Sequence, residues 1–416
     1  MNNQRASLLL AGIILLSVIA LAGLSWANYR YAAQNPGMNA FLPAWSAMRW
    51  FMIKGWSPYS QETRAEMEQF AYGRPANPGE QPGLFTYPLY SILIFGPFAL
   101  IEDFPLARAL WMTLLELALV GIAALGISLA RWQPSRWMTV VLVIFAVFWY
   151  YSARAVINGN PIVLSTFLMM LGFLAMQKEQ DVLAGFLIVL AGIKLEAMFI
   201  LILYVLIWAF SQRRWTLIWS VVASFGFMIA ITSFLISDWT IENLRIIVEY
   251  HKSTFGLTPG SLLAYWLPGI GRQLGWGLTI LIAATLIWEW WSSLGKDFRW
   301  FIWTAYLTLV SLNLVGLRTA LENYVLMVPA FILMLAIWDE RWGKLGRGLM
   351  ILGIFGLFFG VWMSSLNSAR QGVSPDLNTT LMLTTPLFML FGLYWVRMWA
   401  TRPPRMPLEM FGKQLG

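Results

Sequence analysis

The sequence contains no cysteine and only one histidine, His251. Without cysteine the chain can form no disulfide bond, no thiolate metal site and no cysteine nucleophile. A single histidine cannot build a multi-histidine metal centre, and a catalytic triad would depend on that one residue. Few carboxylates cluster in pairs, so we expect no metal site and no cofactor.

Charge is also scarce. Only 12% of the residues are charged, whereas about a quarter are charged in soluble globular proteins. Hydrophobic residues make up 59% and the mean hydropathy is +0.66. The net charge of +8 comes from short basic clusters between apolar runs, as the positive-inside rule expects. This pattern predicts an all-α, polytopic membrane protein surrounded by membrane lipids, and it gives no sign of nucleic-acid binding.

Apolar runs near the length of a membrane-spanning helix, about 20 residues, recur along the whole chain. We interpret the chain as one integral-membrane domain, 1–416, with about twelve transmembrane helices and both termini cytoplasmic. It divides into an extracytoplasmic loop with interfacial helices at 29–104, a transmembrane bundle at 105–396 and a cytoplasmic tail at 397–416. The first span is read as uncleaved. The predicted spans are 7–28, 105–130, 137–153, 161–176, 182–193, 195–210, 216–236, 270–291, 300–317, 323–338, 348–364 and 379–396.

Two apolar segments do not fit simple crossings. Segment 88–101 is short and carries Pro88 and Pro97, which favours a re-entrant or interfacial helix within the first loop. Segment 182–210 is interrupted by Lys194 and Glu196. It is long for one span and short for two, so we expect a hairpin of short helices with both charges at its tip.

The first loop is long, polar and rich in aromatic residues, and an ordered loop of this length carries an entropic cost. We therefore expect the chemistry there. The other predicted outer segments are 154–160, 237–269, 318–323 and 365–378. No internal repeat suggests the two symmetric halves of a secondary transporter. Glu116 is the one good midplane candidate that such a transporter would use, and we expect it to pack against other helices.

Within the first loop, Phe41, Trp45, Met48 and Met52 recur at helical spacing. This spacing fits an amphipathic helix over 40–54 lying on the bilayer surface. Such a helix is either a plain membrane anchor or one wall of a groove for a lipid-linked substrate. In the second case Arg49 or Lys54 would lie near the substrate phosphate.

Three further places combine charge with a turn or an apolar run. The turn with Arg154, Asn158 and Asn160 is a simple turn signal, but an arginine at a cavity mouth also suits a phosphate. Lys194 and Glu196 are costly in an apolar segment, so they are either functional or a structural ion pair. The third place has two charged residues four positions apart, a spacing that allows a structural pair along a helix. They are Arg318 and Glu322.

The order of several short motifs resembles a known family. These are GWSPY at 55–59, TYP at 86–88, the Gly159–Asn160 turn, AGIK at 191–194 and ENYVLMVP at 322–329. Together they are similar to the GT-C superfamily of membrane glycosyltransferases, and within it to family 87, which uses polyprenyl-phosphomannose. The resemblance covers about the first four-fifths of the chain. It implies an inverting transfer of mannose or another hexose from a polyprenyl-phosphate donor to a lipid or glycan acceptor at the outer membrane face.

The resemblance also implies an aspartate near the start of the first loop that takes the proton of the acceptor hydroxyl. The matching stretch places Ala40 at that position. Three explanations are open: an inactivated form, a different register, or a base that has moved. Candidates for a moved base are Glu62, Glu66, Glu80 and Glu322. We favour a family member that lacks its usual base.

The resulting site prediction contains residues of the first loop and of the facing turns. A non-catalytic lipid-binding or scaffold protein of the same fold, and a secondary transporter, are the alternative functions. The predicted substrate-binding residues are Asn39, Arg49, Tyr59, Tyr87, Arg154, Asn158, Asn160, Lys194, Glu196, Arg318 and Asn323.

Overall fold

The computed structural model describes residues 2–77, 80–253, 258–315, 320–372 and 378–402. Within these ranges all regular structure is helical, as expected from the composition. The helices of the first half are α1 (Asn2–Gln34), α2 (Phe41–Lys54), α3 (Gln61–Tyr72), η1 (Leu89–Ser91), α4 (Ile92–Ala99), α5 (Phe104–Leu129), α6 (Arg136–Phe148), α7 (Tyr150–Ile157), α8 (Ile162–Gln177), α9 (Asp181–Ala191), η2 (Gly192–Lys194) and α10 (Leu195–Ser211).

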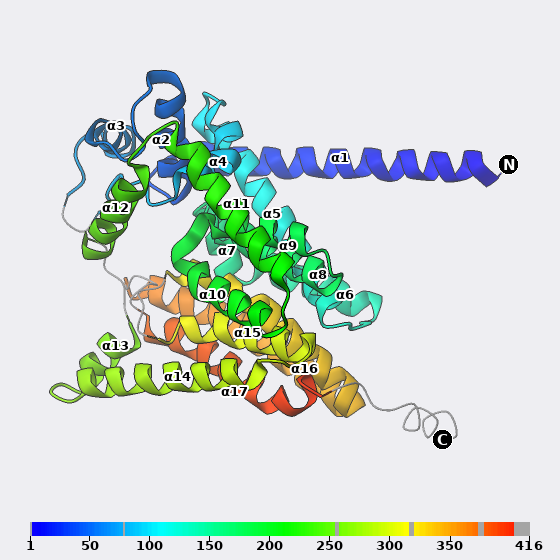
Figure 1. Ribbon diagram of the computed structural model, residues 1–416. Helices are drawn as coiled ribbons and strands as arrows, with labels where there is room; N and C mark the ends of the chain where they lie inside the picture. Colours follow the sequence, from blue (N-terminus) through cyan, green and yellow to red (C-terminus); the bar gives the residue numbers. More distant parts are fainter. Residues whose placement is uncertain (1, 78–79, 254–257, 316–319, 373–377, 403–416) are drawn as a thin grey trace, which may run out of the picture.

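The second half continues the same architecture. Its helices are α11 (Trp215–Ser233), α12 (Trp239–Ser253), α13 (Pro259–Trp266), α14 (Gly271–Ser293), α15 (Phe298–Leu312), η3 (Leu321–Met327), α16 (Val328–Arg370) and α17 (Thr379–Ala400). The N-terminal part of α1 and the C-terminal end of α17 point to the right in Figure 1, whereas α2, α3 and α12 lie together on the left. We call this left side, residues 35–103 with α12, the first-loop end.

Helices cover most of each predicted span, but not always as one helix. Span 137–153 is divided between α6 and α7, span 323–338 between η3 and α16, and span 300–317 ends outside the described residues. By length and composition, however, six helical runs of the described chain could cross a membrane, or seven if the bent pair α6–α7 is counted. The structure therefore supports a multi-pass protein but does not show twelve crossings. One reason is length: α8 has only 16 residues and α15 only 15, short of the roughly 20 that a crossing needs.

Segment 181–211 reverses direction at η2, where Lys194 leaves the helical region with φ −108° and ψ 68°. An ion pair shows this reversal: Arg214, just after α10, bonds to Asp181 at the start of α9. A continuous helix from Asp181 to Arg214 would place those residues about 50 Å apart. The predicted hairpin with Lys194 and Glu196 near its tip agrees with this geometry.

A glycine separates the two spans predicted at 323–338 and 348–364. α16 runs from Val328 to Arg370 but breaks at Gly343, whose φ is 53° and ψ −115°. The left-handed φ favours glycine because a side chain would be strained there. The break therefore falls in the predicted connection.

The predicted surface helix of the first loop is a helix, but its first two turns are not on a surface. Phe41, Trp45 and Met48 are 0%, 3% and 0% exposed, whereas Met52 is 41% exposed. The Phe41 ring stacks on Trp111 of α5 at 5.3 Å. The interfacial prediction is wrong for these turns because the aromatic residues of the loop pack with α4 and α5 into a core of their own.

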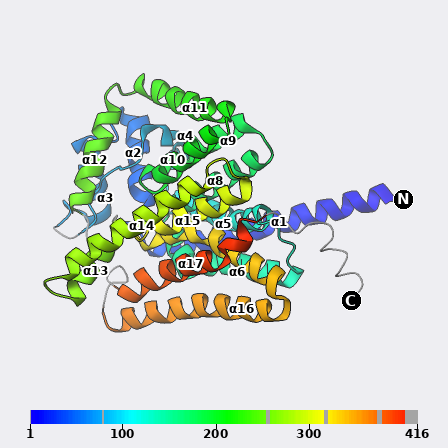
Figure 2. The same cartoon turned by 60° about the horizontal axis from the view of Figure 1, so that its bottom comes forward.

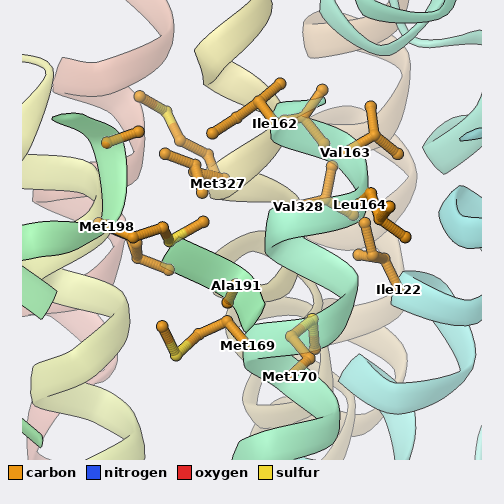
Figure 3. Packing of buried hydrophobic residues seen from close by; sticks show 14 of the residues in the cluster. Ile122, Ile162, Val163, Leu164, Met169, Met170, Ala191, Met198, Met327 and Val328 are labelled. Atoms are coloured by element: carbon orange, nitrogen blue, oxygen red, sulfur yellow. The ribbon is translucent and has the colours of Figure 1, made fainter. Parts of the chain in front are cut away.

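The main core is formed around α8, which packs on α5 and α9 and against η3. Figure 3 shows Val163 of α8 on the side of Ile122 of α5 and Val328 of α16, and Met169 of α8 beside Ala191 of α9. All five side chains are at most 1% exposed. This packing fixes the ends of α7, η2 and η3 relative to one another, and those ends carry the polar residues described next.

Candidate functional site

Arg154, Asn158 and Glu322 form one buried polar contact between α7 and η3. Arg154 Nε donates to Glu322 Oε1 at 2.6 Å, and the Asn158 side-chain amide donates to the same oxygen. The Glu322 side chain is only 5% exposed. The four-residue spacing places Arg154 and Asn158 on one face of α7. A charge at this depth needs such partners, since burial without them is costly.

The turn after α7 depends on Gly159. Its φ is +64°, and a Cβ there would lie 2.6 Å from the Cβ of Phe41. The Gly159 carbonyl accepts a hydrogen bond from Trp111 Nε1 at 2.8 Å. Glycine thus allows the turn to pass closely over the start of α2.

Lys194 lies on the other side of this turn. Its ammonium donates to Asn160 Oδ1 at 2.8 Å and lies 3.8 Å from Glu196. Asn160 Oδ1 also accepts from the backbone N–H of Ile162. Tyr90 donates to the Gly192 carbonyl at 2.9 Å, which ties the hairpin tip to the first loop. Lys194 is 7% exposed and the Glu196 side chain 34%.

Position 40 adjoins the Arg154 group directly. The Ala40 N–H donates to the Asn158 carbonyl at 2.8 Å, and the Tyr87 hydroxyl donates to the Ala40 carbonyl at 3.4 Å. Asn39 Oδ1 accepts from the N–H groups of Phe41 and Leu42, so it caps α2. Residue 40 is therefore one backbone hydrogen bond away from the Arg154–Asn158–Glu322 contact.

Two tyrosines of the first loop support this arrangement. Tyr59 donates to the Tyr87 carbonyl at 2.8 Å. Burial raises the pKa of Tyr87, and the charge of Glu196 and the nearby Tyr250 raise it further. Burial, and then the charge of Glu242, also raises the pKa of Tyr59. Both phenols therefore remain protonated donors at neutral pH. We call the set Ala40, Tyr87, Arg154, Asn158, Asn160, Lys194, Glu196 and Glu322 the polar cluster.

The other predicted acids of the first loop lie outside the polar cluster and face different partners. Glu62 is exposed in the first turn of α3, and a backbone hydrogen bond lowers its pKa. Glu66 pairs with Lys54 at 3.2 Å. Glu80 takes two bonds from Arg74, at 2.7 and 2.8 Å, and these lower its pKa to about 2.

The remaining predicted residues are placed as follows. Arg49 donates to the Ala99 carbonyl at 3.2 Å, within the first loop. Asn323 is buried on η3 beside Glu322. Arg318 lies outside the described residues. Glu116 accepts from Asn28 at 2.8 Å, so it packs against α1 as expected.

Two residues near the cluster had no recognisable signal in the sequence. Arg108 of α5 donates to the carbonyls of Asn35 and Ile157, at 2.5 and 2.8 Å, and so joins the first loop to α7. Asn243 of α12 donates to the carbonyls of Thr86 and Tyr87. Each contact joins segments far apart in the chain, which spacing alone cannot show.

The polar cluster is neither a metal site nor part of the groove between α9 and α11. Within the described ranges, no group of three or more His, Asp or Glu residues could hold a metal ion. The groove is lined by residues such as Glu179, Asp181 and Thr216. It opens at the start of α9, whereas Lys194 follows the end of that helix.

Comparison with known proteins identifies the family. A sequence model of glycosyltransferase family 87 matches residues 85–312, which is more than half of the chain. The matched range includes Tyr87, Arg154, Lys194 and Asn243, while Ala40 and Glu322 lie outside it. No curated protein and no solved structure matches the chain. The chain, with its apolar helices and buried polar cluster, therefore belongs by this match to glycosyltransferase family 87, a family of membrane glycosyltransferases.

Proposed function

We propose that the chain is built to move a hexose such as mannose from a polyprenyl-phosphate donor to a lipid or glycan acceptor. The first-loop end would lie at the outer face of the cytoplasmic membrane, in a GT-C arrangement of about twelve spans, and transfer would invert the anomeric carbon. The observation that carries this proposal is the polar cluster itself. In a chain of family 87, it brings two basic side chains, Arg154 and Lys194, together with the position of the expected base.

Each basic side chain has a fixed neighbour. Glu322 holds Arg154 at 2.6 Å and Asn160 holds Lys194 at 2.8 Å. Cations held in place before reaction stabilise the charge that develops on a departing phosphate, because they need no reorganisation. We assign Arg154 and Lys194 to the donor phosphate, and Glu322, Asn158 and Asn160 to orienting them.

The acceptor hydroxyl must lose a proton as it attacks, and Ala40 cannot accept one. Glu322 Oε1 already accepts from two donors, which favours an orienting role over a proton-accepting one. The pKa of about 2 makes Glu80 a poor proton acceptor near neutral pH. Among the described residues of the cluster, Glu196 is the carboxylate whose oxygens accept no hydrogen bond; it pairs with Lys194 at 3.8 Å. Glu196 is therefore the alternative base if the chain as it stands transfers sugar.

We propose instead that the chain lacks its usual base and that an aspartate at position 40 would supply it.

The test compares three purified proteins in lipid nanodiscs: the chain as it stands, Ala40→Asp and Ala40→Asn. Each is incubated with radiolabelled polyprenyl-phosphomannose and a membrane lipid extract. We expect transfer only with Ala40→Asp, since asparagine matches its shape but cannot accept the proton. Transfer by the chain as it stands would show that the base lies elsewhere, and Glu196→Gln and Glu322→Gln would then identify it.

Ala40 also favours a second function, a lipid-binding protein of the same fold without catalysis. That protein would retain a polyprenyl phosphate yet gain no transfer activity in Ala40→Asp. Retention measured on the same nanodiscs separates the two functions.

A further inference from the structure

Helix α12 belongs to loop 237–269, yet it packs on the first loop. Figures 1 and 2 both show it beside α2 and α3. Two polar contacts hold it along its length: Ser57 donates to Glu242 at 3.0 Å, and Arg64 donates to Glu249 at 2.7 Å. The two loops therefore form one polar interface at the first-loop end.

A third contact of α12 reaches the polar cluster. The side-chain amide of Asn243 donates to the Thr86 carbonyl at 3.1 Å and to the Tyr87 carbonyl at 3.0 Å. Asn243 is only 6% exposed. Tyr59 donates to the same Tyr87 carbonyl at 2.8 Å. Three hydrogen bonds thus fix the backbone of two consecutive residues that belong to no regular element.

The fixed backbone determines where the Tyr87 ring lies. The ring contacts Phe85 and Phe95, with centroids 5.6 and 5.3 Å apart. Its hydroxyl donates to the Ala40 carbonyl, while the Ala40 N–H donates to Asn158. Both polar backbone groups of residue 40 are therefore held, one from the first loop and one from the turn after α7.

We propose that Asn243 is a positioning residue for position 40. By holding the carbonyls of Thr86 and Tyr87, it keeps the Tyr87 hydroxyl on residue 40 and fixes that residue against Asn158 and the Arg154–Glu322 pair. The contacts of Ser57 and Arg64 keep α12 docked when the amide is removed, so a substitution at Asn243 should act locally. Only the activity part of the test below depends on the proposed function.

The first test uses the natural absence of cysteine. Ala40→Cys introduces a single thiol, whose rate of labelling by a small water-soluble maleimide reports how tightly residue 40 is held. We expect Asn243→Asp, which keeps the shape but loses both donors, to speed labelling about tenfold. Leu244→Ala is the matched control, since Leu244 is 63% exposed on the same helix. Thermal unfolding of each variant is measured alongside.

Faster labelling in Asn243→Asp, with the rate in Leu244→Ala unchanged, supports the proposal. An unchanged labelling rate in Asn243→Asp would overturn it, and a lowered unfolding temperature with an unchanged rate would assign Asn243 to stability alone. This result does not depend on sugar transfer, so it stands if the proposed function fails.

The second test adds Asn243→Asp to Ala40→Asp and measures steady-state transfer. A misplacement of the base by about 1 Å can lower the rate roughly 100-fold, so we expect kcat to fall while KM for the donor changes little. A rise in KM with unchanged kcat would contradict a positioning role at residue 40.

Discussion

Two buried arginine–glutamate pairs lie in different surroundings. In the polar cluster, Arg154 of α7 pairs with Glu322 of η3, whose side chain is 5% exposed. At the other pair, Arg397 of α17 bonds to Glu289 of α14, whose side chain is 6% exposed. The exposure of the two carboxylates is nearly equal, so burial alone cannot separate a binding site from a structural clasp.

The neighbours of the two pairs make the difference. Arg397 donates through Nε and Nη2 to one oxygen of Glu289, and its guanidinium lies 5.0 and 5.3 Å from the rings of Trp300 and Trp303. Because aromatic rings surround its guanidinium, we interpret this pair as a structural contact between α14 and α17. The Arg154 pair has the Asn158 amide beside it, and Asn158 connects it to position 40 through a backbone hydrogen bond. Polar, convergent neighbours are typical of a ligand site.

The largest effect is expected from Lys194. In the Ala40→Asp protein, Lys194→Met should lower the transfer rate about 100- to 1,000-fold, because a fixed cation at the leaving phosphate is lost. Methionine fills a similar length without charge. Lys178→Met, at an exposed lysine after α8, serves as the control for lost positive charge. An equal loss in both variants would contradict a specific role for Lys194.

A smaller effect, on stability, is expected at Gly159. Gly159→Ala places a Cβ 2.6 Å from that of Phe41 and requires a left-handed residue. We expect a loss of roughly 1–3 kcal/mol in the free energy of unfolding, measured by thermal unfolding in detergent. Gly226→Ala is the control, because a Cβ there meets nothing within 4 Å. A neutral Gly159→Ala would mean that the turn does not press on α2.

The smallest effect is expected at Glu80. Its pKa is about 2, below the usual 4.5, because Arg74 bonds to it. Any stabilisation from this pair is therefore complete above pH 4.5 and disappears as the pH falls towards 2. Glu80→Gln in the Ala40→Asp protein should leave the rate unchanged between pH 5 and 8. A large loss of rate in Glu80→Gln across that range would identify Glu80 as the base.

The sequence predicted helical segments well because long apolar runs carry their own signal. It also placed the hairpin tip at Lys194, since a charge interrupts the apolar run there. It predicted the wrong surroundings for Phe41, Trp45 and Met48, because the same spacing fits a helix on a membrane and a helix buried in a loop.

The partners within the polar cluster could not be predicted. Spacing suggested Arg318 as a partner of Glu322, and Arg318 lies outside the described residues. The structure places Arg154 and Asn158 on that carboxylate, from 168 and 164 residues away, which no spacing could indicate. Asn243 has no sequence signal at all, since its two acceptors are backbone carbonyls. Contacts of this kind depend on how distant segments pack.

The central claim is that the Arg154 pair belongs to a donor site and the Arg397 pair does not. Binding of a fluorescent polyprenyl phosphate to Arg154→Gln, Arg397→Gln and the unmodified chain tests it most directly. We expect Arg154→Gln to weaken binding at least tenfold, since a charged hydrogen bond contributes about 1.5–3 kcal/mol. Arg397→Gln should lower the unfolding temperature and leave binding unchanged. Equal affinity in Arg154→Gln and the unmodified chain would contradict the account.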